Sequence, residues 1–195
     1  MGLEEMKGLT TMVLSFLETL TYDQFEQMMF MEQEYYGLEN ITPAEEAFRW
    51  YQKYPYTTIA ASDGKEIAGF INLFPVKKQV FELLKTGQFN DHDLKLEDIA
   101  NIDEPGNEDL NMYLCCIVVK EKYRKENLSK KLLQVALLSY QRVWDRCKWI
   151  ITDNVTEKGA HFSEKYGLSF ICRTNHGSNI YMGSFQKFVD RAFAE

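Results

Sequence analysis

A short basic turn between two apolar segments is the part of this sequence best suited to chemistry. The run MYLCCIVV at residues 112–119 leads through YRKEN into LSKKLLQVAL, an apolar stripe with helical spacing. A strand that enters a helix through a tight turn directs several free backbone N–H groups toward one spot, which suits a phosphate. Arg124, Lys125, Lys130 and Lys131 add positive charge. The turn therefore predicts a phosphate site, unless Asn127 is only the N-cap of a core helix.

The cysteine and histidine residues could also take part in catalysis, but their positions in the sequence support this less strongly. Cys115 and Cys116 could supply a nucleophile, and in a regular strand one of two neighbours faces each side. No histidine adjoins them in the sequence, and apolar surroundings favour core packing. His161 and His176 are suited to proton transfer, but an isolated histidine more often has a structural role. His176 also lies in an expected hairpin turn, where it could contact a substrate.

The elements that must position these groups alternate between helical and strand patterns. The segment around residues 12–20 predicts a strand, and Thr21 or Asp23 could cap the helix that follows. Thr42 is expected to cap a second helix that has Pro43 at its first position. Asp63-Gly64 predicts an antiparallel hairpin. The remaining expected elements are a short helix at 76–89, a central strand at 111–119, a helix at 128–146, a strand at 148–155, a helix at 157–167 and a hairpin at 168–185.

Residues 76–110 interrupt this alternation with an acidic segment. Its second half has eight carboxylates and Lys95 as the only opposing charge. One interpretation is a solvated surface insertion. The other is a rim that attracts a cationic substrate through a field that salt would screen.

The element order and two motifs resemble the GNAT family of N-acetyltransferases. In IVVKEKYRKENLSKKLLQVAL, Arg124 matches the Arg/Gln position of the family's phosphate turn, Asn127 stands where the first glycine is usual, and Ser129 is the second small residue. In EKGAHFSEKYGLSF, Gly167 and Leu168 match the end of the family's second motif. The resemblance covers most of the chain except the insertion.

This resemblance implies an α/β fold with a mixed, mostly antiparallel central sheet flanked by helices, in one domain over residues 1–195. It also implies acetyl-CoA as cosubstrate. The backbone of Ile117, Val118 and Val119 would pair with the pantetheine arm. The pyrophosphate would lie on the turn made by Arg124, Lys125, Glu126, Asn127, Leu128, Ser129 and Lys130.

The catalytic positions implied by the family are altered here. The usual glutamate base aligns with Tyr113, so Glu108 or Asp109 could act through water, although both also suit rim charges. The usual tyrosine that protonates the leaving thiolate aligns with Ser163, a much weaker acid. Tyr166, Tyr140 or Tyr113 could replace it, but core packing is the simpler explanation for Tyr140 and Tyr166.

The composition argues against two classes of protein and indicates a cellular compartment. The formal charge of −7 argues against a general nucleic-acid binder, and no stretch has the apolar length of a membrane span. The four cysteines lack metal-ligand spacing and indicate a reducing, cytoplasmic compartment.

The leading hypothesis is an N-acetyltransferase that acts on a primary amine of a small molecule or an exposed amino group. The alternatives are a catalytically weak CoA-binding module of the same fold and an α/β interaction domain without CoA. The apolar tail FQKFVDRAFAE could dock on its own domain or on a partner, and the resemblance allows a homodimer.

Overall fold

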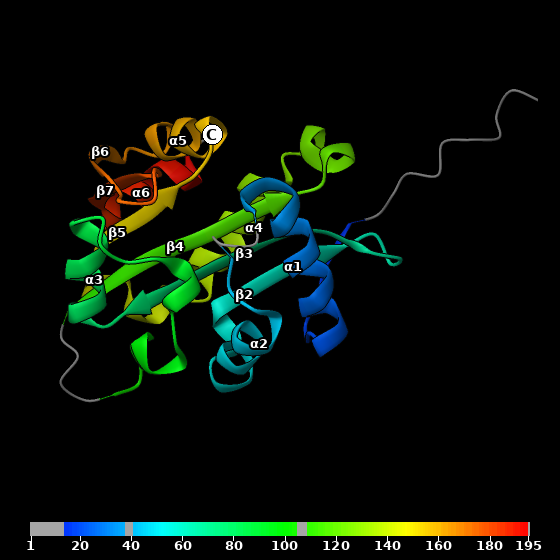
Figure 1. Ribbon diagram of the computed structural model, residues 1–195. Coiled ribbons are helices and arrows are strands. Elements are labelled where there is room, and N and C mark those ends of the chain that lie inside the picture. Colours follow the sequence, from blue (N-terminus) through cyan, green and yellow to red (C-terminus); the bar gives the residue numbers. More distant parts are fainter. Residues whose placement is uncertain (1–13, 38–40, 105–108, 195) are drawn as a thin grey trace, which may run out of the picture.

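The computed structural model describes residues 14–37, 41–104 and 109–194, and its centre is a seven-stranded sheet (Figure 1). The spatial order is β1-β2-β3-β4-β5-β7-β6. Only β4 and β5 run parallel among the described neighbours. The mixed, mostly antiparallel sheet is therefore confirmed. The strands are β1 (Ser15–Phe16), β2 (Thr58–Ser62), β3 (Ile67–Val76), β4 (Leu110–Val119), β5 (Cys147–Asn154), β6 (Ser169–Arg173) and β7 (Asn179–Ser184).

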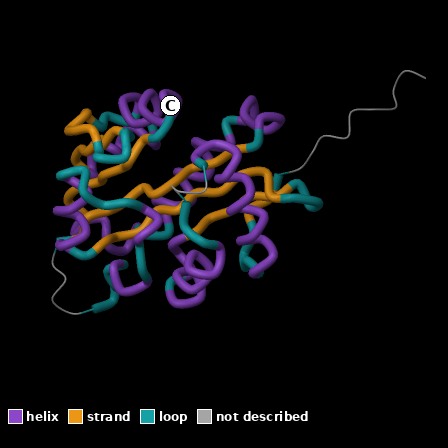
Figure 2. The backbone as a smooth tube through the Cα atoms, in the orientation of Figure 1, coloured by secondary structure: helices purple, strands orange, loops and turns teal. Residues whose placement is uncertain are grey.

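Helices cover both faces of the sheet (Figures 1 and 2). One face carries α1 (Tyr22–Tyr36), α2 (Ala44–Lys53) and α3 (Lys78–Lys85). The other carries α4 (Leu128–Leu138), α5 (Glu157–Lys165) and α6 (Phe185–Phe193). Short 3-10 turns connect these elements: η2 (Pro55–Thr57), η3 (Asp91–Asp93), η4 (Leu96–Asp98), η5 (Glu121–Glu126) and η6 (Gln141–Arg146).

β4 is central, as its continuous apolar run predicts, because it lies between β3 and β5 and is covered on both faces. The β2–β3 hairpin also forms at Asp63-Gly64. The Asp63 carboxylate accepts the N–H groups of Lys65 and Glu66 at 2.9 and 3.0 Å, and Gly64 has a φ of 86°.

Of the first two helix starts, one agrees with expectation and one differs. Thr21 caps α1 through a capping box with Gln24, but α2 begins after Pro43, which takes the N-cap position expected for Thr42. Thr42 instead donates its hydroxyl to the carbonyl of Asp91, 49 residues along the chain, at 3.2 Å. This long-range bond replaces a local cap that the sequence pattern favoured.

The long helix expected at 128–146 is two elements. The α-helix ends at Leu138, and the 3-10 turn Gln141–Arg146 follows. The buried Tyr140 hydroxyl donates to the Leu73 carbonyl at 2.6 Å, and the Trp144 indole donates to the Leu137 carbonyl at 3.0 Å. The Leu137 carbonyl also accepts the Tyr140 backbone N–H at 3.0 Å, so side-chain and backbone bonds together end the helix at this point.

The acidic segment is not a solvated insertion along its whole length. Leu94, Ile99, Ala100 and Ile102 are buried in the core, and Ile99 forms a β-bridge with Val76. Charged neighbours such as Asp93 and Glu97 remain exposed. Because apolar and acidic residues alternate, the apolar side chains pack this segment against the sheet while most of its carboxylates remain in solvent. Asp91 is the exception described below.

The C-terminal tail docks on its own chain. It forms α6, whose Phe185, Phe188, Val189 and Ala192 are buried against the same core as α4. No helix in the described residues has the length and apolar character needed to cross a membrane.

Candidate active site

The sheet opens between β4 and β5. Their parallel pairing extends only as far as Leu114 and Thr152, after which β5 turns away from β4 (Figure 1). In the β3–β4 register, Asn72 pairs with Cys116 and Leu73 with Leu114, so Cys115 is an extra, bulged residue. The bulge and the separation leave one edge of residues 115–119 without a neighbouring strand.

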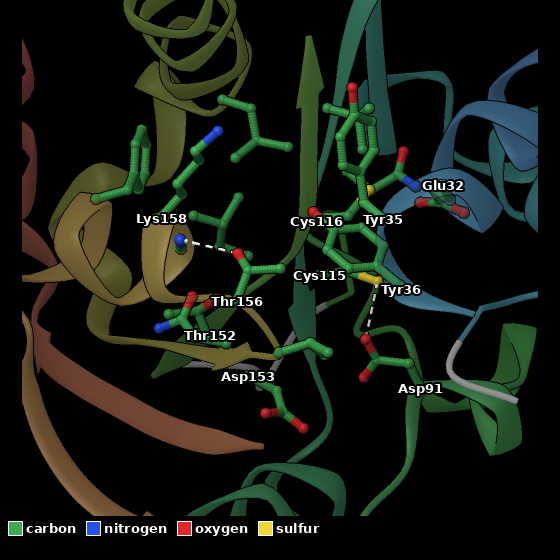
Figure 3. A pocket seen from close by; sticks show the side chains of 18 of the residues that line it. Glu32, Tyr35, Tyr36, Asp91, Cys115, Cys116, Thr152, Asp153, Thr156 and Lys158 are labelled. Atoms are coloured by element: carbon green, nitrogen blue, oxygen red, sulfur yellow. Dashed lines mark hydrogen bonds between the residues drawn. The ribbon is translucent and has the colours of Figure 1, made fainter. Parts of the chain in front are cut away.

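A cavity of about 580 Å³ fills this opening (Figure 3). Its wall includes residues 114–119 of β4, residues 152–159 at the β5–α5 junction, and Glu32, Tyr35 and Tyr36 of α1. Lining side chains come from both faces of the sheet, because Leu114 belongs to the core under α4 and Cys116 to the core under α1. The cavity therefore passes through the opening in the sheet, from the face covered by α4 to the face covered by α1.

The basic turn forms one end of this cavity. Asn127 has φ 53° and ψ 28°, and it is the only non-glycine residue with positive φ in the described ranges. Asparagine tolerates this left-handed conformation, so the turn persists without the usual glycine. Asn127 occupies the N-cap position of α4 but makes no side-chain cap hydrogen bond. The N–H groups of the first turn of α4 are thus left for another acceptor.

Arg124 extends from this turn across the cavity toward α1. Its guanidinium donates to the Tyr35 hydroxyl at 2.7 Å and to the Val119 carbonyl at 3.2 Å. Ser129 also lines the cavity, as do Ile117, Val118 and Val119.

The other residues expected at the cofactor do not line the cavity. Lys125, Glu126 and Asn127 are exposed, and Leu128 is buried in the core. Lys130 donates to the Ala194 carbonyl at 2.7 Å.

A second helix N-terminus lies across the cavity. Thr156 caps α5 by accepting the Gly159 N–H at 3.1 Å, and Lys158 lines the same wall. Two helix N-termini, Arg124 and Lys158 favour an anion at this end of the cavity, although the carboxylate of Glu157 also lines it.

Carboxylates form the opposite end. Asp91 lies on η3, where Asn90 caps the turn by accepting the His92 N–H at 3.0 Å and Thr42 holds the Asp91 carbonyl. The Asp91 carboxylate accepts a hydrogen bond from the Tyr113 hydroxyl and lies 3.7 Å from the Cys115 sulfur. Burial, together with the nearby charges of Asp153 and Glu32, raises the pKa of Asp91 to about 7.

Glu32 approaches from α1 and is only 8% exposed. It accepts a hydrogen bond from the Cys116 thiol, but burial dominates and raises its pKa to about 7. Tyr36 lies among these groups, and burial raises the pKa of its hydroxyl well above the usual value. Figure 3 shows Glu32 and Tyr36 on the α1 side of the cavity.

Asp153 and Asn72 complete the acidic end. One oxygen of Asp153 lies 3.1 Å from Nε2 of His176, whereas Oδ1 is buried without a hydrogen-bond partner. Oδ1 of Asn72 is also buried and unpartnered, and both residues line the cavity.

Both cysteines line the cavity, which corrects the expectation that one would face each side. The bulge at Cys115 breaks the regular alternation. A hydrogen bond with Cys116 lowers the pKa of Cys115, but burial and the charges of Asp91 and Glu32 outweigh it and raise the value to about 12. Burial also raises the pKa of Cys116. Neither thiol is disposed to ionise.

The expected catalytic residues lie in different places. Glu108 is outside the described residues, and Asp109 is exposed, 3.5 Å from the Lys148 ammonium. Tyr113 reaches the site through Asp91. Ser163 is fully buried and accepts the Asn154 amide at 2.8 Å, while Tyr166 packs against Phe162 and Phe188. Neither Ser163 nor Tyr166 lines the cavity.

The remaining candidates also lie apart from the cavity wall. Tyr140 is buried in the core. His161 is exposed, and its Nδ1 lies within hydrogen-bond distance of the Glu157 carbonyl. His176 contacts the site only through Asp153.

Sequence reasoning did not select Glu32, Asp91 or Asp153 as site residues. A signal existed for Glu32, because it follows Phe25 and Met28 on the apolar side of its helix, where a carboxylate is out of place. Asp91 belonged to the acidic segment already suspected of attracting a cation. Asp153 had no signal, since an aspartate at the end of a strand is ordinary.

The cavity fits acetyl-CoA on its own features. The unpaired edge of residues 115–119 can receive an extended amide-containing chain, and the two helix N-termini can receive phosphates. The residues that would hold the anionic part are the backbone of the α4 first turn, Ser129, Arg124 and Lys158.

Comparisons with known proteins agree with this geometry. The model of the Acetyltransferase (GNAT) family matches residues 25–167. No curated protein matches the chain significantly. The loading GNATL domain of CurA from Lyngbya majuscula has a similar fold, with a TM-score of 0.62, 9% identity, and coverage of 89% of this chain and 98% of that one.

Two further solved structures have the same fold and carry CoA or an analogue. Naa50 from Arabidopsis thaliana, in complex with the bisubstrate analogue CoA-Ac-MVNAL, gives a TM-score of 0.58 at 12% identity, covering 88% of this chain and 98% of that one. The NatC complex bound to Gag peptide and CoA gives 0.58 at 17% identity, covering 88% and 96%. Because the family match spans most of the sequence and the fold agrees, this chain belongs to the Acetyltransferase (GNAT) family, and it is an acyltransferase with acetyl-CoA as its cosubstrate.

Proposed function

We propose that this protein is an N-acetyltransferase that acetylates a primary amine of a small molecule or an exposed amino group. One observation carries the proposal: a single cavity has a cationic end at two helix N-termini and an acidic end at Asp91, and the two ends meet at the bulge in β4. An anionic cosubstrate and a cationic acceptor are thus drawn to opposite ends of one site.

Asp91 is the proposed general base. A primary amine with a pKa near 10 is an ammonium ion at neutral pH and must lose a proton before it can attack a carbonyl. When bound, acetyl-CoA would supply the acetyl group as a reactive thioester: the amine nitrogen bonds to the acetyl carbon, the C–S bond breaks, and the second proton lost by the nitrogen neutralises the leaving CoA thiolate. The Asp91 carboxylate, with a pKa of about 7, is suited to accept the proton near neutral pH. Tyr113 fixes its orientation from the buried side. Asp91 thereby takes the role first considered for Glu108.

A direct transfer is more consistent with the site than an acetyl-cysteine intermediate. Cys115 is adjacent to Asp91, but a thiol with a pKa of about 12 supplies almost no thiolate at neutral pH. We also propose a cytoplasmic location, which the cysteine spacing in the sequence favours. A homodimer stays a prediction.

Substitution of the proposed base tests this mechanism. Asp91→Asn keeps a hydrogen-bond acceptor for Tyr113 but removes the base, so kcat/KM should fall about 100-fold or more. Asp93→Asn, on the exposed side of the same turn, is the matched control and should behave like wild type. The measurement is CoA release with acetyl-CoA and a panel of primary amines, with the acetylated product identified by mass spectrometry.

In the wild type, kcat/KM should rise with pH through about 7 as Asp91 ionises. Equal rates for the two variants would remove Asp91 from the mechanism. Saturable acetyl-CoA binding without turnover of any amine would favour the weak CoA-binding module instead.

A further inference from the structure

The acidic end of the cavity is rich in hydrogen-bond acceptors, and no lysine or arginine of the described residues lines it. Glu32 and Asp91 form no ion pair within the described part of the chain. Oδ1 of Asp153 and Oδ1 of Asn72 are buried without a partner. Asn72 is 7% exposed, and the Asp153 side chain 5%. Buried acceptors without donors are costly, so this arrangement is built for a ligand that donates several hydrogen bonds.

These acceptors form two neighbouring groups along β4. Asp91 lies against Cys115, and the charge of Asp153 acts on Asp91. Glu32 bonds to Cys116, and Asn72 is the cross-strand partner of Cys116, so their polar atoms lie on the same face. The first group is the proposed reaction centre. The second group, Glu32 with Asn72, does not receive the proton, and Glu32 affects the transfer only through its charge, which raises the pKa of Asp91.

We propose that the acceptor is a short dicationic amine, an α,ω-diamine or a polyamine, with its reacting nitrogen at Asp91 and its distal ammonium at Glu32 and Asn72. This inference rests on the proposed function and specifies its substrate class. An ammonium group offers three donors and one positive charge, which matches a buried carboxylate and an unpartnered amide oxygen on the same face of the sheet.

A singly charged acceptor fits this wall less well. A peptide α-amine brings one charge and would leave Glu32 or Asp91 without a counter-ion. A metal ion is also a poorer match, because no group of three His, Cys, Asp or Glu side chains in the described residues is arranged to hold one. A cavity of about 580 Å³ accommodates a small molecule in addition to the end of a thioester.

The experiment compares putrescine with butylamine, which has the same carbon chain and one charge fewer. Both amines are assayed with wild type, Glu32→Gln and Glu34→Gln. Glu34 lies on the same helix but is exposed, so it controls for the loss of one negative charge. The assay is run above pH 7, where Asp91 is ionised with or without the charge of Glu32. For Glu32→Gln we then expect kcat/KM for putrescine to fall about 30-fold, the effect of removing one partner of a buried charge pair, with little change for butylamine. Glu34→Gln should change neither value.

Binding measured without acetyl-CoA separates this inference from the proposed function. By calorimetry, putrescine should bind wild type and Glu34→Gln but bind Glu32→Gln much more weakly. If Glu32→Gln lost the same factor in kcat/KM for both amines, or left kcat/KM for putrescine unchanged, the proposed distal ammonium site would be refuted. The proposed acetylation of amines would be unaffected by that result.

If neither amine is acetylated but putrescine still binds through Glu32, the acetyltransferase mechanism fails and the dication site stands. Should Glu32→Gln not fold, the wild-type preference for putrescine over butylamine decides, and equal kcat/KM values refute the inference.

Discussion

Glu32 is a carboxylate placed where a helix normally buries an apolar side chain. It follows Phe25 and Met28 on the inner side of α1, and its raised pKa reflects the cost of ionising it there. A folded-state pKa above the unfolded value means that the folded protein binds more protons, so this group lowers stability as pH rises from about 4.5 to about 7.

Glu32→Gln should therefore stabilise the free protein at high pH. The difference in unfolding free energy between variant and wild type should be small at pH near 5 and grow to about 3 kcal/mol above pH 7, which is about 5 °C or more in Tm. Thermal melts across this pH range, without amine or acetyl-CoA, provide the measurement. A difference that stays constant with pH would show that Glu32 ionises as easily in the folded protein as in water.

The residues at the acidic end of the cavity differ in how well they could be predicted from the sequence. The carboxylate at position 32 violates the pattern of its helix and could have been noticed. Asp91 could be suspected only as one of eight acidic residues, because its selection depends on Thr42 and Asn90, which hold its turn against the cavity. Ser163 was aligned with an acid position, but the bond with Asn154 and complete burial place it outside the cavity wall.

At the scale of elements, the N-terminus of α4 was the best-predicted feature. The basic turn, the left-handed Asn127 and the apolar helix all follow from local chemistry, which a single sequence contains. The helix end was not predictable to the same degree, since it depends on Tyr140 and Trp144 bonding to distant or preceding carbonyls.

A negative charge at the start of α4 should weaken cosubstrate binding. Ser129 lines the cavity one residue after the helix begins, so Ser129→Glu would set a carboxylate against the pyrophosphate. We expect the Kd for acetyl-CoA to rise about tenfold or more. Leu138→Glu, at the exposed far end of the same helix, adds the same charge and should leave the Kd unchanged. Equal effects, measured by calorimetry, would move the phosphate site away from α4.

Across the whole molecule, the sequence predicted the sheet better than the site. The apolar run of β4, the Asp63-Gly64 hairpin and the two helical motifs each rest on neighbouring residues. The cavity arises where α1, the segment around Asp91 and the β5–α5 junction converge, and such convergence depends on contacts between residues far apart in the chain.

The separation of β4 from β5 has a consequence for the order of events. The cavity has a cationic end at α4 and α5 and an acidic end beside α1. If acetyl-CoA binds at the first end and the amine at the second, as we propose, both substrates can be bound at once and CoA does not have to leave before the amine enters. Initial rates at several fixed amine concentrations should thus give intersecting double-reciprocal lines, the signature of a ternary complex. Parallel lines would mean that the enzyme carries the acetyl group between two half-reactions, and they would return attention to Cys115.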